Sequence, residues 1–231
     1  MKVVKFMPNK NKEKVMIYEK AIQNAKRLMK EKTNENKAPS WLLTELAQEV
    51  GNELAQEFGV DKNVVSLTLY LQHLVFNPII GGEIQKNHPN LSANFVIDNQ
   101  LLEKWNIPIE DRSIILDAIR LHHHKEVNPN LTIEVIKNAE CQKFVTVEGA
   151  LIWLHELGLR GIDYEKSKEL VFYKMNQKKN LLTLEKCISR AEESCKKITE
   201  IFESSEYSLE LKELHRLGLE HVPYEETNFK L

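Results

Sequence analysis

The chain has 231 residues, of which 42% are hydrophobic and 29% charged, and its formal net charge is −2. This composition is ordinary for a globular protein, and the length suffices for one substantial core with an appended helical lobe. No segment approaches the roughly 18 unbroken apolar residues that a membrane span needs, and the first residues lack a secretory apolar region. We therefore expect a cytoplasmic protein without a membrane partner.

Apolar residues recur at helical spacing along most of the chain, and no alternating stretch is long enough to demand a sheet. The scarcity of turn formers, 8 Gly and 7 Pro, also argues against an all-β fold. We therefore predict an all-α protein, a multi-helix bundle with additional C-terminal helices. The pattern predicts helices at about 12–32, 41–58, 64–76, 91–102, 111–122, 132–144, 147–157, 165–175, 181–202 and 209–217.

Capping and turn residues mark several of these boundaries. Ser40 and Asp61 are suited to begin the second and third helices, and Gly59 is suited to end the second. The third helix is apolar on most sides, which is typical of a central position. Turns are predicted at Asn77-Pro78, Gly81-Gly82 and Asn128-Pro129-Asn130.

The first segment of the chain is basic. Residues 1–37 carry eleven Lys/Arg against four Asp/Glu. No aromatic residues are interleaved as a single-strand nucleic-acid platform would need, so we favour a solvated helix face over nucleic-acid binding. We divide the chain into an N-terminal basic helix and linker (1–38), a helical core (39–205) and a C-terminal helix and tail (206–231).

Three cysteines, Cys141, Cys187 and Cys195, are odd in number and form no Cys-x-x-Cys pair. This pattern indicates reduced thiols with a structural role. A short motif also recurs, Leu-His-Glu-Leu-Gly-Leu at 154–159 and Leu-His-Arg-Leu-Gly-Leu at 214–219, each followed by Tyr-Glu at the same offset. A helix closed by a C-terminal glycine has this form, so we interpret the echo as convergent capping rather than duplication.

Five of the eight histidines lie in one stretch of the sequence, and each is beside a helical signal. They are His73, His88, His122, His123 and His124. Imidazoles that converge from separate helices are the usual way in which a bundle builds a metal site. Of three consecutive histidines, at most two can point into one pocket, so we expect at least one to face solvent.

Structural roles are the alternatives for the same residues. His73 lies at the end of an apolar helix, where a buried, singly hydrogen-bonded imidazole is common. His88 precedes a proline at a predicted helix start and could be a capping group. Glu140 could pair with Lys137 or Lys143 on its own helix.

Taken in order, four motifs resemble those of the HD-domain metal-dependent phosphohydrolase superfamily. They are Leu71-Gln72-His73, His88-Pro89 with Ser92-Ala93, Ala118-Ile119 with His122-His123, and Ala139-Glu140. The resemblance covers about residues 40–205. It implies an all-helical HD-domain-like core, a divalent metal (Mn, Fe, Co, Mg or Zn), and a nucleotide or phosphate ester as ligand.

The principal metal site of that family does not carry over. By the resemblance, its four ligand positions fall on Leu43, Gln72, His73 and Glu140. Leucine offers no donor atom and glutamine is a poor ligand, whereas Glu140 keeps a carboxylate on a longer side chain. By contrast, His88, His122 and His123 match the positions that hold a second metal in many members.

Two hypotheses follow. In one, a rebuilt site with one divalent ion hydrolyses phosphate esters. In the other, the fold is kept without the chemistry, and the pocket binds a nucleotide, a phosphate ligand or a protein partner. We favour the second because all four principal ligands are changed. The candidate metal ligands are His73, His88, His122, His123 and Glu140, and the candidate ligand-binding residues are Gln72, His124 and Lys125.

Overall fold

The computed structural model of the chain describes residues 10–36, 39–76 and 83–220. Over these ranges it contains eleven α-helices, one 3-10 turn and no strand, so the all-α prediction is confirmed. In chain order the elements are α1 (Lys10–Asn36), α2 (Trp41–Phe58), α3 (Lys62–Leu71), α4 (Glu83–Asp98), α5 (Leu101–Lys104), α6 (Ile109–Leu121), α7 (Leu131–Gln142), η1 (Lys143–Val145), α8 (Val147–Leu159), α9 (Tyr164–Lys179), α10 (Glu185–Glu203) and α11 (Ser208–Glu220). The turns predicted at Asn77-Pro78 and Gly81-Gly82, and the Tyr224-Glu225 pair, lie outside the described residues.

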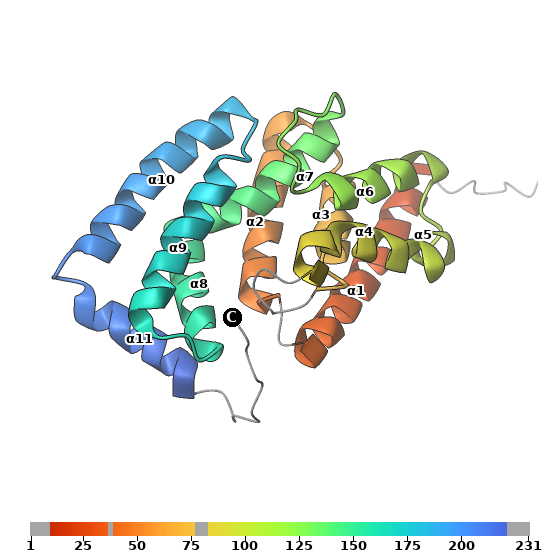
Figure 1. Ribbon diagram of the computed structural model, residues 1–231. Helices are drawn as coiled ribbons and strands as arrows, with labels where there is room; N and C mark the ends of the chain where they lie inside the picture. The colour runs from red at the N-terminus through yellow and green to blue at the C-terminus, as the bar shows by residue number, and fades with distance from the viewer. Residues whose placement is uncertain (1–9, 37–38, 77–82, 221–231) are drawn as a thin grey trace, which may run out of the picture.

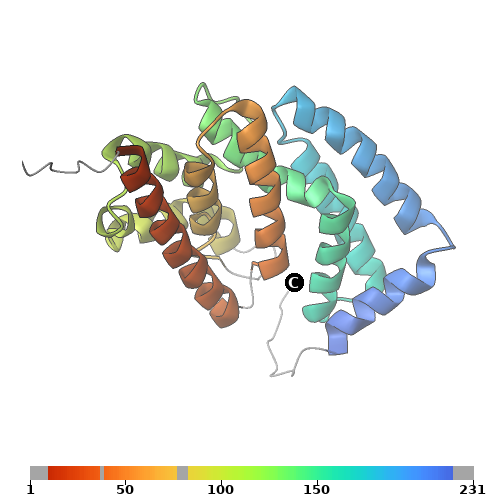
Figure 2. The same ribbon diagram turned by 180° about the vertical axis from the view of Figure 1, so that it is seen from behind.

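The helices form two groups. Figures 1 and 2 show α1, α4, α5 and α6 on one side of the molecule and α8 to α11 on the other, with α2 and α7 between them. The buried apolar side chains form two corresponding clusters. Each group therefore buries its own apolar faces, and the junction between the groups is where α7 meets α3, α6 and α9.

Helix α3 belongs to both clusters, as its apolar sequence predicted. Val65 and Leu69 pack into one cluster, whereas Val64, Leu67 and Leu71 pack into the other. Asp61 caps its N-terminus by accepting a hydrogen bond from the Asn63 amide. The predicted end at residue 76 is wrong, because the helix closes at Leu71 and the chain turns there.

Two helix starts differ from the prediction by more than two residues, and the ends of α1, α4 and α9 differ by four residues each, at Asn36, Asp98 and Lys179. Helix α4 begins at Glu83 rather than near residue 91, and it contains Pro89 in its interior. At this seventh position of the helix, the proline removes one i→i−4 hydrogen bond and its ring crowds the carbonyl four residues earlier. Helix α10 begins at Glu185 rather than at residue 181, because residues 180–184 form a turn.

The repeated Leu-x-x-Leu-Gly-Leu motif marks a helix crossing, so the capping interpretation is wrong. Gly158 and Gly218 are inside α8 and α11, and both are buried. A Cβ atom on Gly158 would lie 2.3 Å from the carbonyl oxygen of His215, and one on Gly218 would lie 2.4 Å from that of His155. The two copies therefore pack against each other reciprocally, at a backbone separation that only glycine permits.

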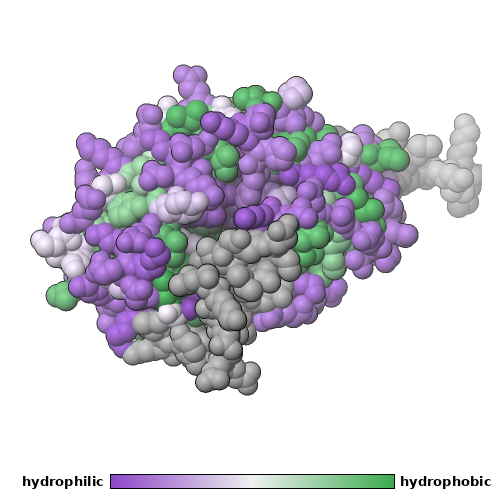
Figure 3. Space-filling model, viewed as in Figure 1, coloured by the Kyte–Doolittle hydropathy of each residue, from purple (hydrophilic) through white to green (hydrophobic). Residues whose placement is uncertain are grey.

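The basic first helix is part of the bundle. Tyr18, Ala21, Ala25 and Met29 of α1 are fully buried, and they belong to the cluster that also holds apolar side chains of α3. Its lysines lie on the outside, where Lys14 Nζ is 3.0 Å from Asp111 Oδ2. The face shown in Figure 3 is mostly hydrophilic, with apolar side chains in small separate groups.

Two further expectations from the sequence concern the cysteines and membrane-spanning helices. Cys141, Cys187 and Cys195 are free and buried, as expected for structural thiols. Over the described residues, every helix is too short or too polar to cross a membrane.

Candidate functional site

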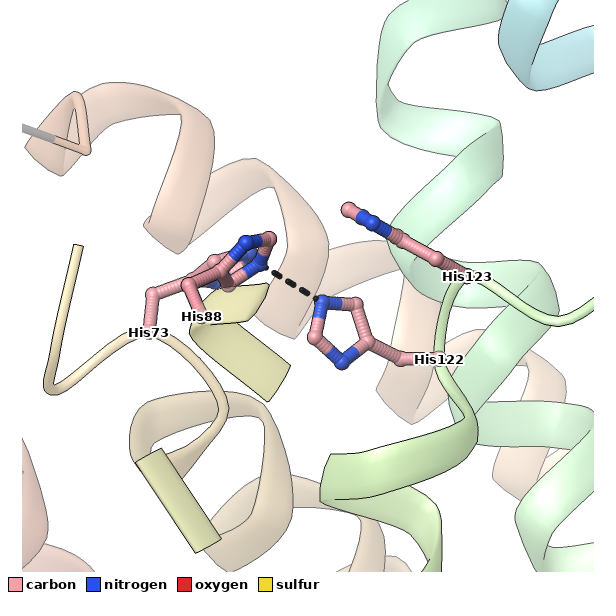
Figure 4. A group of neighbouring side chains, drawn as sticks. All are labelled: His73, His88, His122 and His123. Atoms are coloured by element: carbon pink, nitrogen blue, oxygen red, sulfur yellow. Dashed lines mark hydrogen bonds between the residues drawn. The ribbon is translucent and has the colours of Figure 1, made fainter. Parts of the chain in front are cut away.

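Four histidines meet at one point of the junction between the helix groups. They are His73, His88, His122 and His123, and one potential ligand atom from each lies within 4.8 Å of those from the other three. Figure 4 shows the four rings converging from three parts of the chain: the turn after α3, helix α4, and the end of α6. His88 Nε2 lies 3.1 Å from His122 Nε2.

The ends of two helices decide which histidines converge. On a continuous helix, side chains at successive positions point about 100° apart, so His122 and His123 would diverge. Helix α6 ends at Leu121, and His122 and His123 occupy the turn that follows. Both rings therefore reach the cluster, with centroids 4.2 Å apart. His73 reaches it for the same reason, since α3 has already ended.

The imidazoles are held in a form suited to metal binding. Burial, followed by the positive charge of neighbouring lysines and imidazoles, lowers the pKa of His73 well below its ordinary value. Burial likewise lowers the pKa of His122 and His123. His122 Nδ1 donates a hydrogen bond to the Ile119 carbonyl at 2.6 Å, so the ring-nitrogen lone pair of neutral His122 is on Nε2, the atom that lies 3.1 Å from His88 Nε2.

The donor set favours a transition metal. Imidazole nitrogen suits zinc, iron, cobalt and copper, whereas magnesium prefers oxygen ligands. Tetrahedral zinc bound by four nitrogens places them about 3.3 Å apart, as follows from the usual zinc–nitrogen distance. The separations of 3.1 to 4.8 Å in the cluster are therefore close to that arrangement. The residues fit zinc, iron or cobalt better than magnesium.

Glu140 lies beside the cluster but is engaged elsewhere. Its Oε2 accepts a hydrogen bond from Lys143 Nζ at 2.8 Å and another from the Gln72 side-chain amide. Its Oε1 is 3.6 Å from His73 Nε2 and 3.9 Å from Lys178 Nζ. The expected pairing with Lys143 is thus present. Glu140 is better placed to neutralise lysines and orient His73 than to complete a metal shell.

A pocket of about 450 Å³ opens next to the histidines. His73, His88 and His123 contribute to its wall, and so do Leu43 and Glu140. Its described lining also contains five basic side chains, against Glu140 as the one acid: Lys86, Lys143, Arg160, Lys174 and Lys178. The pocket therefore combines metal-ligating groups with an excess of positive charge, a combination suited to an anion.

Three of these lysines surround one aromatic ring. The ammonium groups of Lys143, Lys174 and Lys178 lie 5.1, 5.1 and 5.6 Å from the centroid of Phe144. Burial, and then the charge of Lys178, lowers the pKa of Lys174 to about 7. Burial also lowers the pKa of Lys143. Three ammonium groups this close repel one another, so an incoming anion would relieve that repulsion.

Sequence reasoning did not find these lysines. One signal was present: Lys174 and Lys178 are four residues apart on α9, and a like-charge pair at that spacing is unfavourable without a compensating partner. Only the packing of α9 against α7 and η1 brings the pair beside Lys143 and Glu140. Among the described residues, this lysine group is the main addition of the structure to the predicted site.

The predicted ligand-binding residues are dispersed. Gln72 is buried against Glu140 and is not part of the described pocket wall. His124 and Lys125 lie on the exposed loop after α6, and His124 Nδ1 is 3.9 Å from Glu126. His124 is therefore the histidine of the triple run that faces solvent.

Comparison of the chain with protein-family models gives no match, and neither does comparison with curated proteins or with solved structures. The function must therefore be inferred from the residues of the chain itself. The four imidazoles, the lysines and the pocket beside them are the groups from which that inference can be made.

Proposed function

We propose that this protein is a divergent HD-domain-like protein that binds a phosphate-bearing ligand, either a nucleotide or a phosphate ester. In this proposal the four histidines hold a divalent transition-metal ion, and hydrolysis is slow or absent. One observation carries the proposal: three of the four clustered histidines, His73, His88 and His123, border the same pocket as a group of three lysines. The only acid in its described lining, Glu140, is already paired with Lys143.

The binding part of the proposal depends on the uncompensated charge. Lys178 Nζ is buried and has no hydrogen-bond partner, and its nearest carboxylate oxygen is 3.9 Å away. A buried ammonium group with only a distant ion-pair contact and no hydrogen bond is unfavourable, and a phosphate oxygen would supply the hydrogen bond. A bound metal ion would supply Lewis acidity and further positive charge on the histidine side of the pocket.

The order of the motifs supports the HD-domain-like part. Gln72-His73, His88, His122-His123 and Glu140 belong to four different segments, yet all of them lie at one junction. Leu43, which stands where the family has its early histidine, lines the same pocket. Five of the positions that resemble the family's ligands therefore line one pocket, namely Leu43, His73, His88, His123 and Glu140, although several of them hold other residues than the family has.

Slow hydrolysis follows from the same changes. Four imidazoles fill a tetrahedral shell, as in structural zinc sites, whereas catalytic zinc sites keep one position open. Leu43 offers no donor atom, and Glu140 is held by Lys143 and Gln72. No carboxylate in the described pocket lining is left to orient a water molecule.

A second candidate function is a divalent-metal-dependent phosphohydrolase with a rebuilt His/Glu site. The observation in its favour is Lys174, whose pKa of about 7 allows it to donate or accept a proton at neutral pH. His123, the least buried of the four histidines, is the ligand that could most easily leave one coordination position open.

Elemental analysis and turnover assays together distinguish the two. Protein purified without a histidine tag should contain stoichiometric zinc, iron or cobalt, and His122→Ala should lose most of it. His124→Ala is the matched control, because His124 is adjacent in sequence but exposed. Turnover of nucleotides and phosphomonoesters with Mn²⁺, Co²⁺ or Mg²⁺ should be no higher in the wild type than in His122→Ala.

Each deviation has a definite meaning. Absence of metal from the wild type, or equal loss in both variants, would refute the metal site. Robust turnover that disappears in His122→Ala would establish the hydrolase instead. Calorimetric titration with inorganic phosphate tests the binding part, and Lys178→Met should weaken that binding about tenfold, as the loss of one charge-assisted hydrogen bond predicts.

A further inference from the structure

Arg160 is a basic side chain of the pocket that the histidines and lysines leave unexplained. It follows α8 directly, it is 9% exposed, and it lines the same cavity. Its Nε and Nη1 atoms are buried without a hydrogen-bond partner. Guanidinium nitrogens donate hydrogen bonds and cannot lose their charge in a protein, so two unsatisfied donors at a cavity wall need an acceptor.

The surrounding residues position the guanidinium without satisfying it. Arg160 lies over the ring of Trp153, with its central carbon 4.8 Å from the ring centroid. The Trp153 Nε1 atom is itself buried and lacks a partner. Glu156, one turn earlier on α8, acts on Arg160 electrostatically, but burial is the larger influence and lowers the pKa of the guanidinium. The cation–π contact fixes the orientation and leaves the donors available.

The end of α8 is rigid where Arg160 is attached. Two residues earlier, Gly158 crosses α11 with the carbonyl of His215 against its Cα. One residue later, Gly161 adopts a φ of +69°, and its amide donates to the Gly158 carbonyl at 2.8 Å. A side chain attached to so constrained a backbone loses little further freedom when it binds an anion.

Arg160 is separate from the lysine group. Trp153 contacts Phe144 edge to face, with centroids 6.0 Å apart, and Phe144 in turn is the ring around which Lys143, Lys174 and Lys178 gather. The wall of the pocket therefore runs from the lysines, across two aromatic rings, to the guanidinium. Two cationic positions are joined by an apolar surface.

From this arrangement we infer that Arg160 and Trp153 form a second oxyanion-binding subsite, so that the ligand carries two separated acidic groups. The inference deepens the proposed function and depends on it for the first group, a phosphate at the lysines. The second group is a carboxylate or a phosphate that accepts hydrogen bonds from Arg160. The intervening part of the ligand lies against Phe144 and Trp153.

A series of synthetic ligands tests the subsite. Straight-chain diol bisphosphates with about three to eight carbons are compared with the monophosphates of the same chains, together with ω-carboxyalkyl monophosphates. At one or more lengths, the doubly acidic compound should bind the wild type about tenfold more tightly than its monophosphate, because it adds one charge-assisted hydrogen-bonded group. The carboxylates and the bisphosphates then show which acid Arg160 prefers.

Two variants show which side chains bind each acidic group of the ligand. Arg160→Met should abolish the advantage of the second acid and leave monophosphate binding unchanged, whereas Lys178→Met should weaken both classes of ligand. Monophosphate binding thus reports on the proposed function, and the added gain reports on the subsite. Suppose that the second acid improves affinity only when Arg160 is present, while Lys178→Met leaves monophosphate affinity unchanged. That result would support the Arg160 subsite and refute the lysine site.

Several results would overturn the inference. They are the absence of any gain at every length, equal weakening of all ligands by Arg160→Met, or no binding of either class. Stability provides an independent measurement. Because Arg160 has unsatisfied donors, Arg160→Met should not lower the thermal unfolding midpoint, and a marked fall would mean that the arginine serves the fold instead.

Discussion

Helix α7 and the η1 turn that follows it contain two buried Glu–Lys ion pairs of the same spacing, in different surroundings. Glu134 pairs with Lys137 at 2.6 Å, and Glu140 pairs with Lys143 at 2.8 Å. In both pairs the lysine follows the glutamate by three residues, and all four residues are at most 2% exposed. They differ in what lies around them, and this difference separates a structural ion pair from a functional one.

The first pair is closed. Glu134 also accepts hydrogen bonds from the Asn128 amide at 2.7 Å and from the Thr183 hydroxyl, and Lys137 donates to the Glu126 carbonyl at 2.8 Å. The pair thereby joins α7 to the loop before it and to the turn before α10. Both carboxylate oxygens of Glu134 and the ammonium group of Lys137 have hydrogen-bond partners within the protein, so no ligand is needed.

The second pair is open. Glu140 and Lys143 both line the pocket, and the nearby Lys178 Nζ and Gln72 Oε1 are buried without hydrogen-bond partners. One carboxylate here faces several cations, so the local charge is incompletely balanced. An ion pair with unsatisfied donors beside a pocket can accept an anion. The first pair has no such unsatisfied donors next to it, so it offers no anion site.

Removing the carboxylate from each pair should give the largest effect and also the clearest contrast. Glu134→Gln and Glu140→Gln should each lose about 3 kcal/mol of unfolding free energy, because a buried lysine loses its counter-ion. Denaturant titration measures the loss. Added sulfate should restore stability to Glu140→Gln, whose lysines border the pocket, and not to Glu134→Gln.

Chloride at matched ionic strength is the control for general salt effects. Equal rescue of both variants by sulfate would mean that the second pair is no more open than the first. The same conclusion would follow if sulfate rescued neither variant.

The pH dependence of anion binding should give a smaller effect. Lys174, with a pKa lowered to about 7 chiefly by burial, is charged below that pH and neutral above it. The charged groups acting on it are Lys178, Glu140, Lys143 and Cys141. Sulfate does not titrate in this range, so its affinity should fall about tenfold, the equivalent of one pKa unit, as pH rises from 6 to 8.5.

The lowered pKa also has a consequence for folding. The unfolded chain keeps this lysine protonated up to its ordinary value of 10.5, so between about pH 7 and 10.5 it binds more protons than the folded chain. The free energy of unfolding should therefore rise as pH increases from about 7 to 10.5. This stabilisation is complete above pH 10.5 and is lost as pH falls toward 7. Lys174→Met should weaken the pH dependence both of sulfate affinity and of the unfolding free energy. If the pH dependence of sulfate affinity were the same in the variant as in the wild type, Lys174 would be excluded from the anion site.

The smallest predicted effect concerns the closed pair. Thr183→Val removes a hydroxyl that donates to Glu134 and accepts from the Asn138 side-chain amide. It should cost only about 1 kcal/mol of unfolding free energy, because Glu134 keeps Lys137 and Asn128 as donors and Asn138 still donates to the Glu134 carbonyl. It should leave sulfate affinity unchanged. Thr199→Val is the control, because that hydroxyl bonds only within its own helix, to the Cys195 carbonyl. A change in sulfate affinity with Thr183→Val would show that the two pairs are coupled.

Sequence periodicity determined the helical class and most helix positions. Apolar residues must face a core whatever the final topology, so their spacing alone predicts the helices. The capping signals at Ser40, Asp61 and Gly59 were also reliable, since they act within a few residues of the chain. The same locality explains the errors at residues 76 and 181. No glycine or proline marks the end of α3 at Leu71, and none separates Leu181 from the start of α10 at Glu185.

The candidate site was only partly accessible to sequence. Its histidines could be named because imidazole is uncommon and has few structural uses, and the structure brings four of the five together. Glu134 and Glu140, however, have the same partner spacing and the same helix. Nothing local distinguishes them, and the sequence motif Glu-x-x-Lys predicts an ion pair for both.

Tertiary packing decided the rest. The approach of α9 to α7 places Lys174 and Lys178 beside Glu140, and the glycine crossing of α8 with α11 constrains the backbone on which Arg160 stands. Lys174 and Lys178 are at least 34 residues from Glu140 along the chain, and the part of α11 that contacts Gly158 is farther still from that glycine. No short-range sequence pattern therefore predicts these contacts. Sequence determines which side chains carry the chemistry, but burial and charge balance depend on what surrounds each of them in three dimensions, and only the fold supplies those surroundings.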